Sequence, residues 1–176
     1  MLFRIASSIF LLSTGLFLAP MPSFSSQENS SSYKVLASQK AGLNLGTVKN
    51  YIKEGDEAME QEDLDLARKN FDKARVLTKQ LLGFYRDLNG SFRGIDARIP
   101  REMDLKGREA SLLLAKTNLR LAALFRRQKQ SEVAVPLLVE VVRLMSPAKS
   151  EGQIAYQSLL ELGFVETPYA GAKGSN

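Results

Sequence analysis

The chain of 176 residues contains no cysteine, no histidine and no tryptophan. Without cysteine it forms no disulfides, offers no thiolate metal ligands and has no cysteine nucleophile. Without histidine it lacks the one side chain whose unperturbed pKa lies near neutral pH, so most hydrolase and zinc chemistries are excluded. The remaining acid–base groups are carboxylates, lysines and tyrosines. We therefore expect no metal site, no cofactor and no enzymatic activity, and an enzyme is the weakest of the function classes considered.

The excess of positive charge is also small. The chain has 24 lysines and arginines and 19 aspartates and glutamates, which gives a net charge of +5. So small an excess favours acidic partners without specifying one. Apolar residues make up 44% of the chain and charged residues 24%, which is typical of one globular domain. Because aromatic residues form no stacking platform, we expect no nucleic-acid partner.

Residues 1–25 have the pattern of a secretory signal peptide. Arg4 supplies a positive charge, the run from Ile5 to Ala19 is mostly apolar, and Ser23-Phe24-Ser25 matches a small-x-small cleavage site. We expect export to a bacterial periplasm or to a thylakoid lumen. An uncleaved N-terminal membrane anchor is the alternative, although the apolar run is short for a helix that must cross roughly 30 Å of hydrocarbon.

The rest of the chain divides by composition into a flexible linker at 26–42, an all-α domain at 43–166 and a flexible tail at 167–176. Within the domain, apolar residues recur every three or four positions, as on one face of a helix, and no strand-like alternation competes. The pattern predicts about five helices in one compact right-handed array.

Individual helices are predicted from their apolar stripes and end signals. The first stripe runs from Val48 to Met59. A longer second stripe runs from Leu64 to Leu88, with Asp63 as its N-cap. Later helices are expected from about Glu102 to Arg127, from Ser131 to Met145, and from Ser150 to Gly163. Ser150 and Gln153 have the spacing of a capping box, and Gly163 suits a left-handed C-cap.

The most informative segment is a helical hairpin between residues 51 and 74. Its packing residues are predicted to be Tyr51, Gly55, Ala67, Phe71 and Ala74. The two small residues Gly55 and Ala67 let antiparallel helices touch, Phe71 fills the space beside them, and Ala74 admits the next helix. This spacing resembles the tetratricopeptide repeat, whose two-helix unit has about 34 residues. A generic hairpin in an up-and-down bundle is the alternative.

A fainter copy of the pattern lies 67 residues later, at Ala122, Ala134, Leu138 and Val141. Two tetratricopeptide-like units are fewer than the roughly three that a solenoid needs to bury its faces. The array must therefore close with irregular helices or form a homodimer. The overall pattern is also similar to exported tetratricopeptide proteins of cyanobacteria and chloroplasts. Such a resemblance implies a groove that binds a protein or peptide partner.

A second candidate feature is the basic region from Arg86 to Lys129 and, within it, residues 89–101. Two glycines and a proline interrupt the helical pattern there, so we expect a loop without regular structure. The candidate partner contacts in this loop are Phe92, Arg93, Arg98, Ile99 and Arg101. Arginine side chains suit carboxylates or phosphates, and the two apolar residues can anchor a partner. The alternative is an insert whose apolar residues pack on the core while its arginines remain solvated.

The sequence thus predicts an exported, non-enzymatic protein–protein interaction module, an adaptor or assembly factor. It binds a partner in its helical groove, with the loop at 89–101 contributing. The alternative is a structural helical-bundle subunit that docks electrostatically on a membrane complex or an anionic membrane surface.

Overall fold

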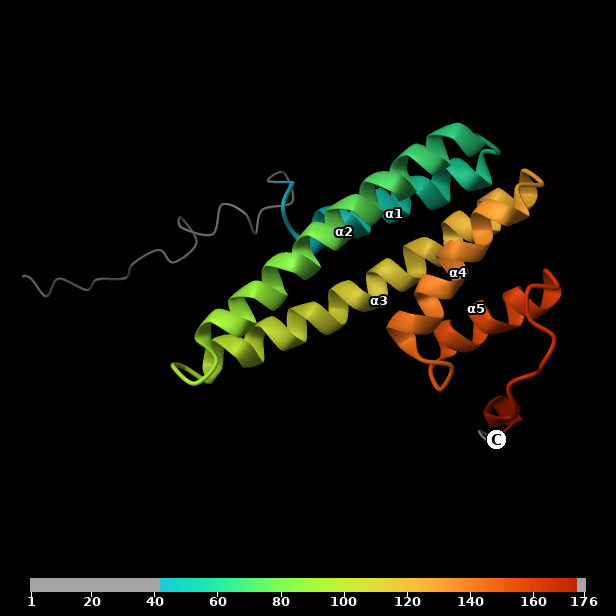
Figure 1. The fold of residues 1–176 in the computed structure, drawn as a ribbon. Helices are drawn as coiled ribbons and strands as arrows, with labels where there is room; N and C mark the ends of the chain where they lie inside the picture. Colours follow the sequence, from blue (N-terminus) through green and yellow to red (C-terminus); the bar gives the residue numbers. More distant parts are fainter. Residues whose placement is uncertain (1–41, 174–176) are drawn as a thin grey trace, which may run out of the picture. The chain divides into compact units, whose positions relative to one another are not determined.

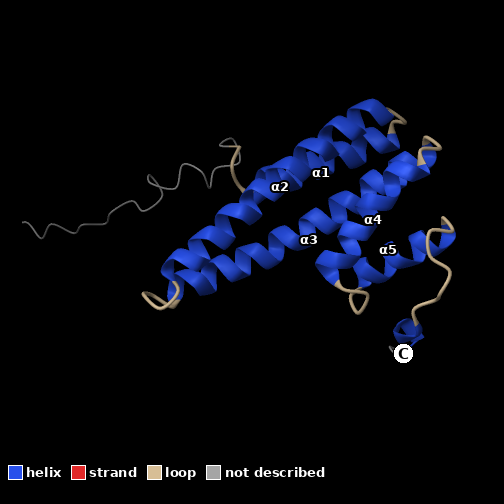
Figure 2. Ribbon diagram, viewed as in Figure 1, coloured by secondary structure: helices blue, strands red, loops and turns tan. Residues whose placement is uncertain are grey.

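The computed structural model of the protein describes residues 42–173. The predicted signal peptide at 1–25 lies outside the described residues, as does the predicted linker except for Gly42. The helices are α1 (Leu45–Glu60), α2 (Leu64–Phe92), α3 (Arg98–Arg127), α4 (Ser131–Met145) and α5 (Ser150–Glu161), followed by the single-turn 3-10 helix η2 (Ala170–Lys173) (Figures 1 and 2). Among the described residues there is no strand, so the predicted all-α class is confirmed.

Each helix packs against the next one along the chain: α1 on α2, α2 on α3, α3 on α4, and α4 on α5. Short turns join α1 to α2 and α3 to α4, and α2 and α3 run side by side along most of their length (Figure 1). The larger core cluster includes the fully buried Phe71, Leu121 and Leu138, and a smaller one joins α1 and α2 through Val48 and Leu81. The five helices therefore form one helix-on-helix array.

The contact between α1 and α2 is built on small residues. A Cβ atom at Gly55 would overlap the ring of Phe71, and Ala67 and Ala74 are completely buried on α2. Tyr51 is half-buried beside them, with the Lys73 ammonium 5.3 Å from its ring centroid. These five positions therefore lie at the contact between the two helices.

Three helices end in turns of the same type, and these turns are spaced at intervals that match the repeat pattern. Glu62, Lys129 and Gly163 have φ values of 61°, 60° and 71°, and they lie 67 and 34 residues apart. After each of them the next backbone N–H donates to the carbonyl five residues earlier: Asp63 to Ala58, Gln130 to Phe125, and Phe164 to Leu159. This is the hydrogen bond of a Schellman motif. The described array is therefore compatible with a helical repeat.

The expectation of an irregular loop at 89–101 is wrong. Helix α2 continues to Phe92 and α3 begins at Arg98, so that only residues 93–97 connect them. The amide of Asn89 donates from Nδ2 to the Pro100 carbonyl (3.0 Å) and to Asp104 Oδ1 (2.7 Å), tying the two helix ends together. Pro100 lies in the first turn of α3, where its missing N–H costs nothing.

Two smaller expectations also differ from the structure. Leu88, expected in the core stripe of α2, is 44% exposed. The N-cap of α5 is Lys149 and carries no side-chain capping bond, because the Ser150 hydroxyl donates to Glu151 Oε2 instead (2.9 Å). By contrast, the predicted cap at Asp63 is confirmed, since its Oδ1 accepts from the Leu66 N–H at 2.9 Å.

The segment after α5 touches that helix. The Tyr156 hydroxyl donates to the Thr167 carbonyl at 2.7 Å, and the rings of Tyr156 and Tyr169 pack edge to face. The flexibility of residues 167–176 stays a prediction. Across residues 42–173, no helix combines the length and the apolar character that a membrane span requires.

Candidate functional site

The main candidate site is a groove of about 990 Å³ between the C-terminal half of α2, the N-terminal half of α3 and the turn from α4 into α5. We call it the interhelical groove. Its apolar lining is formed by Leu82, Met103, Leu112, Leu144 and Met145. Its basic side chains are Arg86, Arg93, Arg108 and Lys149. An apolar surface with a few charged groups is the usual composition of a binding site.

Local sequence features shape this groove. Gly90 on α2 and Gly107 on α3 line it, and no neighbouring atom lies within 4 Å of the position that a Cβ would take at either one. The missing side chains therefore leave the helix surface open to a ligand. On the opposite wall, a Cβ at Gly152 would overlap the carbonyl of Ser146, so glycine is required for α5 to turn back closely against α4. That turn places Lys149 beside the groove.

The acidic residues of the groove already have partners. Asp104 accepts the 2.7 Å hydrogen bond from Asn89, and Glu109 pairs with Lys49 of α1 at 2.7 Å. At Glu151, a hydrogen bond from its own backbone N–H and one from the Ser150 hydroxyl hold the carboxyl pKa below its ordinary value. Each of these carboxylates therefore already has a hydrogen-bond or ion-pair partner in the chain.

The basic residues are less fully satisfied. Arg93 donates from Nη2 to the neutral Asn89 Oδ1 at 3.1 Å, and Arg86 is paired only with its chain neighbour Asp87 at 3.4 Å. Within residues 42–173, Arg108 and Lys149 form no ion pair, although the Lys149 ammonium helps to lower the pKa of the Glu151 carboxyl group. The groove thus presents guanidinium and ammonium groups with donor capacity to spare, which suits carboxylates of a ligand.

Tyr85 adds a polar group to the wall of the groove. Burial raises the pKa of its phenol, Lys106 opposes that effect and Glu109 adds to it, with a net rise. The hydroxyl is therefore neutral over the whole physiological range and is able both to donate a hydrogen bond to a ligand and to accept one from it.

The residues proposed from the sequence are distributed over different surfaces. Of the five, Arg93 lines the groove, while Phe92 and Ile99 are half-buried at the ends of α2 and α3. Arg98 is 90% exposed and pairs with Asp96 at 2.7 Å, and its hydrogen bonds hold the pKa of the Asp96 carboxyl below its usual value. Arg101 is exposed in the first turn of α3.

The structure adds groove residues that the loop hypothesis missed. Arg86 and Arg108 belong to the basic region recognised in the sequence, and their spacing from Arg93 and Leu112 places them on the groove side of α2 and α3. Lys149 lies in a short turn, and no local pattern distinguishes it from any other surface lysine. Only the packing of α4 against α3 brings it to the groove.

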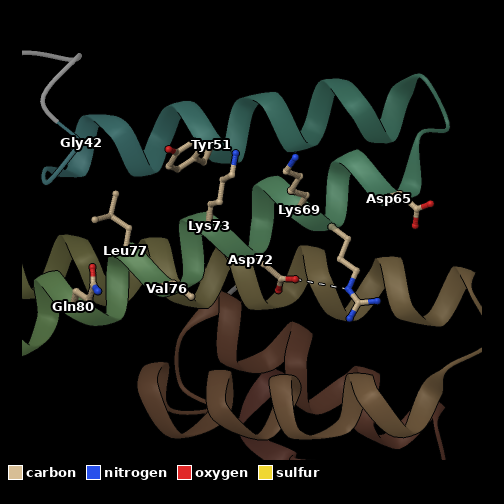
Figure 3. A pocket seen from close by; sticks show the side chains of 10 residues that line it. Gly42, Tyr51, Asp65, Lys69, Asp72, Lys73, Val76, Leu77 and Gln80 are labelled. Carbon is tan, nitrogen blue, oxygen red and sulfur yellow. Dashed lines mark ion pairs between the residues drawn. The ribbon is translucent and has the colours of Figure 1, made fainter.

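A second hollow, of about 660 Å³, lies along the outer side of α2 next to Tyr51 (Figure 3). Two of its cations are engaged within the chain. Lys73 lies over the Tyr51 ring, and Arg68 pairs with Asp72 at 3.7 Å (Figure 3) while its guanidinium carbon lies 5.1 Å from the Phe125 ring centroid. The interhelical groove is larger and has more cations without an ion pair than this hollow, in which Lys69 alone among the described cations has neither an ion pair nor a ring contact, so the groove is the stronger candidate.

No family model, curated protein or solved structure matches the chain.

Proposed function

We propose that this chain is a non-enzymatic adaptor or assembly factor that holds a segment of a partner protein in the interhelical groove. The observation that carries the proposal is the groove itself, where an apolar floor lies beside Arg93, Arg108 and Lys149 and the nearby carboxylates are already occupied. A groove of this composition selects a ligand that is apolar on one side and acidic on the other.

The best-matched ligand is an amphipathic helix with carboxylates along one edge. Apolar side chains at helical spacing would lie on Leu82, Leu112 and Leu144, and acidic residues would meet the basic groups at the margin. The open backbone at Gly90 and Gly107 would let that helix approach more closely than the neighbouring side chains otherwise permit.

The tetratricopeptide resemblance supports the same function. The recurring turns at Glu62, Lys129 and Gly163 fit a repeat of about 34 residues, and proteins built this way present extended binding surfaces. In the proposal, the signal-like residues 1–25 direct the chain to a periplasm or a thylakoid lumen, where the absence of cysteine leaves its stability to core packing.

A second candidate function is electrostatic docking on a membrane complex or an anionic membrane surface. The observation that favours it is the exposure of Arg86, Arg98 and Arg101 near the connection between α2 and α3. Each basic residue near such a surface contributes about 1 kcal/mol, and this attraction weakens as salt rises.

The test is capture of partners from soluble and membrane extracts of the protein's own source, at low and at high salt. Three baits are compared: the unaltered chain, the groove variant Arg93→Gln/Arg108→Gln, and the control Arg98→Gln/Arg101→Gln, which removes the same charge outside the groove. We expect one stoichiometric protein, retained at high salt by the unaltered chain and the control and lost from the groove variant. Capture only at low salt, weakened equally by both variants, would support electrostatic docking instead.

A further inference from the structure

Helix α2 is much longer than α1, and one of its faces continues beyond the point where α1 begins. Leu77 and Leu81 belong to the cluster that packs against Val48 and Ile52 of α1. The same face of α2 continues at helical spacing with Phe84 and Leu88. Leu81 is 3% exposed, whereas Phe84 is 48% and Leu88 44% exposed.

This surface, which we call the hairpin face, has Phe84 and Leu88 at its centre and residues of α3 along its edge. It lies on the α1 side of the α2–α3 pair, because Leu77 and Leu81 of the same face of α2 pack against α1 and Glu109 of α3 pairs with Lys49 of α1. Phe84 and Leu88 do not line the interhelical groove. On α2 the two surfaces are therefore distinct, whereas on α3 Glu109 borders both of them.

The charges at the edge of the hairpin face alternate. Glu102, Lys106 and Glu109 follow one another at helical spacing, and Lys106 pairs with Glu102 at 2.7 Å. Such an edge repels neither sign strongly, unlike the basic groove. Consider two identical helices that run in opposite directions and are related by a two-fold axis. If each carries an acid and a base one helical turn apart, the axis places the acid of one helix opposite the base of the other.

We propose that the hairpin face binds a second copy of this chain, forming a symmetric dimer in which two α2–α3 pairs pack as four helices. A self-complementary interface requires apolar residues at its centre, and charges along its edge that pair with the opposite charges of the second copy. In this dimer Phe84 and Leu88 become buried, and Lys106 of each copy faces the Glu102 position of the other. The apolar lining and the arginines of each interhelical groove lie outside this interface.

The test is the oligomeric state of the purified chain, measured by sedimentation over a range of concentrations. Phe84→Asp and Leu88→Asp are compared with Val76→Asp, which alters another exposed apolar residue of α2, 58% exposed, outside the hairpin face. We expect the first two variants to raise the dimer dissociation constant at least tenfold and Val76→Asp to leave it unchanged. Equal helical content by circular dichroism shows that all three variants fold.

A charge swap tests the edge of the face. Lys106→Glu alone should weaken the dimer, and Glu102→Lys/Lys106→Glu should restore it, because the opposed pairs re-form with their signs exchanged.

A monomer at every concentration would overturn the proposal, as would a dimer that all three aspartate variants leave intact. Capture of a partner in the groove is independent of both results, so loss of the dimer leaves the proposed function standing.

Discussion

Gly55 shows how a single residue fixes the α1–α2 contact. The position of its absent Cβ is filled by the ring of Phe71, which is completely buried. Glycine in a helix interior is less favourable than alanine by about 1 kcal/mol. Close packing against an aromatic ring offsets that cost, so the residue is explained by its neighbour and not by its own helix propensity.

Gly55→Ala should therefore destabilise the protein. The added methyl group forces Phe71 out of its position, and overpacking of this kind costs about 1–3 kcal/mol. The control is Gly83→Ala on α2, where no atom lies within 4 Å of the new methyl group. That change should stabilise the helix by up to about 1 kcal/mol. Urea unfolding followed by circular dichroism measures both, and equal effects of the two substitutions would contradict this explanation of Gly55.

Single residues also show what could be predicted from the sequence. The Asp63 cap depends only on residues three positions apart, and it is confirmed. Leu88 has the periodicity of a core residue, but its burial depends on where α1 begins, and that helix does not reach it. Ser150 bonds to the adjacent Glu151 side chain in place of a backbone N–H. Local hydrogen bonds were predictable where no second side chain competed.

Among the helices, Glu140 of α4 connects three elements. Its carboxylate accepts from Arg75 of α2 at 2.8 Å and from Asn118 of α3 at 2.9 Å, and it pairs with Lys79 of α2 at 2.7 Å. Burial alone would raise the pKa of this carboxyl group. The hydrogen bonds from Lys79, Arg75 and Asn118 outweigh burial, and the net pKa lies below its ordinary value.

Glu140→Gln should lower the free energy of unfolding by about 1–3 kcal/mol at pH 7, since it removes hydrogen bonds to a charged group. The pKa of the Glu140 carboxyl group in the folded chain lies below the unfolded value of about 4.5, so this stabilisation is complete at pH values above 4.5. It is lost as pH falls through the folded pKa, so the free energies of unfolding of the unaltered chain and of Glu140→Gln should become equal in acid.

Unfolding by urea at a series of pH values measures the difference. Glu60→Gln, which alters an exposed carboxylate of α1, is the control and should change stability by less than about 0.5 kcal/mol. A Glu140→Gln effect that stays constant from pH 7 into the acid range would show that its carboxylate charge contributes nothing.

The connection between α2 and α3 shows why element boundaries were only partly predictable. The predicted range of α4 matches its observed range of Ser131–Met145, where the apolar pattern is dense. At 89–101, glycine and proline suggested a loop, but Asn89 is buried and bonds across to Pro100 and Asp104. Those bonds lie between two helices, so no single-helix pattern reveals them.

At the scale of the whole molecule, the helical class was predictable because it follows from periodicity along the chain. The interhelical groove was not, because its walls come from α2, α3 and the turn before α5. The basic region recognised in the sequence pointed to Arg93. The three-dimensional packing shows that Arg108, from the same region, and Lys149 also line the groove. The described unit thus carries a basic groove and, next to it, the hairpin face with charges of both signs, which suits an adaptor that uses one surface for a partner and another for itself.

The most direct test of the groove as a binding site is site-specific photocrosslinking in the protein's own source. A photoreactive amino acid replaces Leu82, which lines the groove, or Val76, which lies six residues earlier on α2 and outside the groove. We expect the probe at Leu82 to crosslink one protein other than a second copy of this chain, and the probe at Val76 not to crosslink it. Crosslinking of that protein from Val76 but not from Leu82, or no crosslink from either position, would contradict the groove as the site of partner binding.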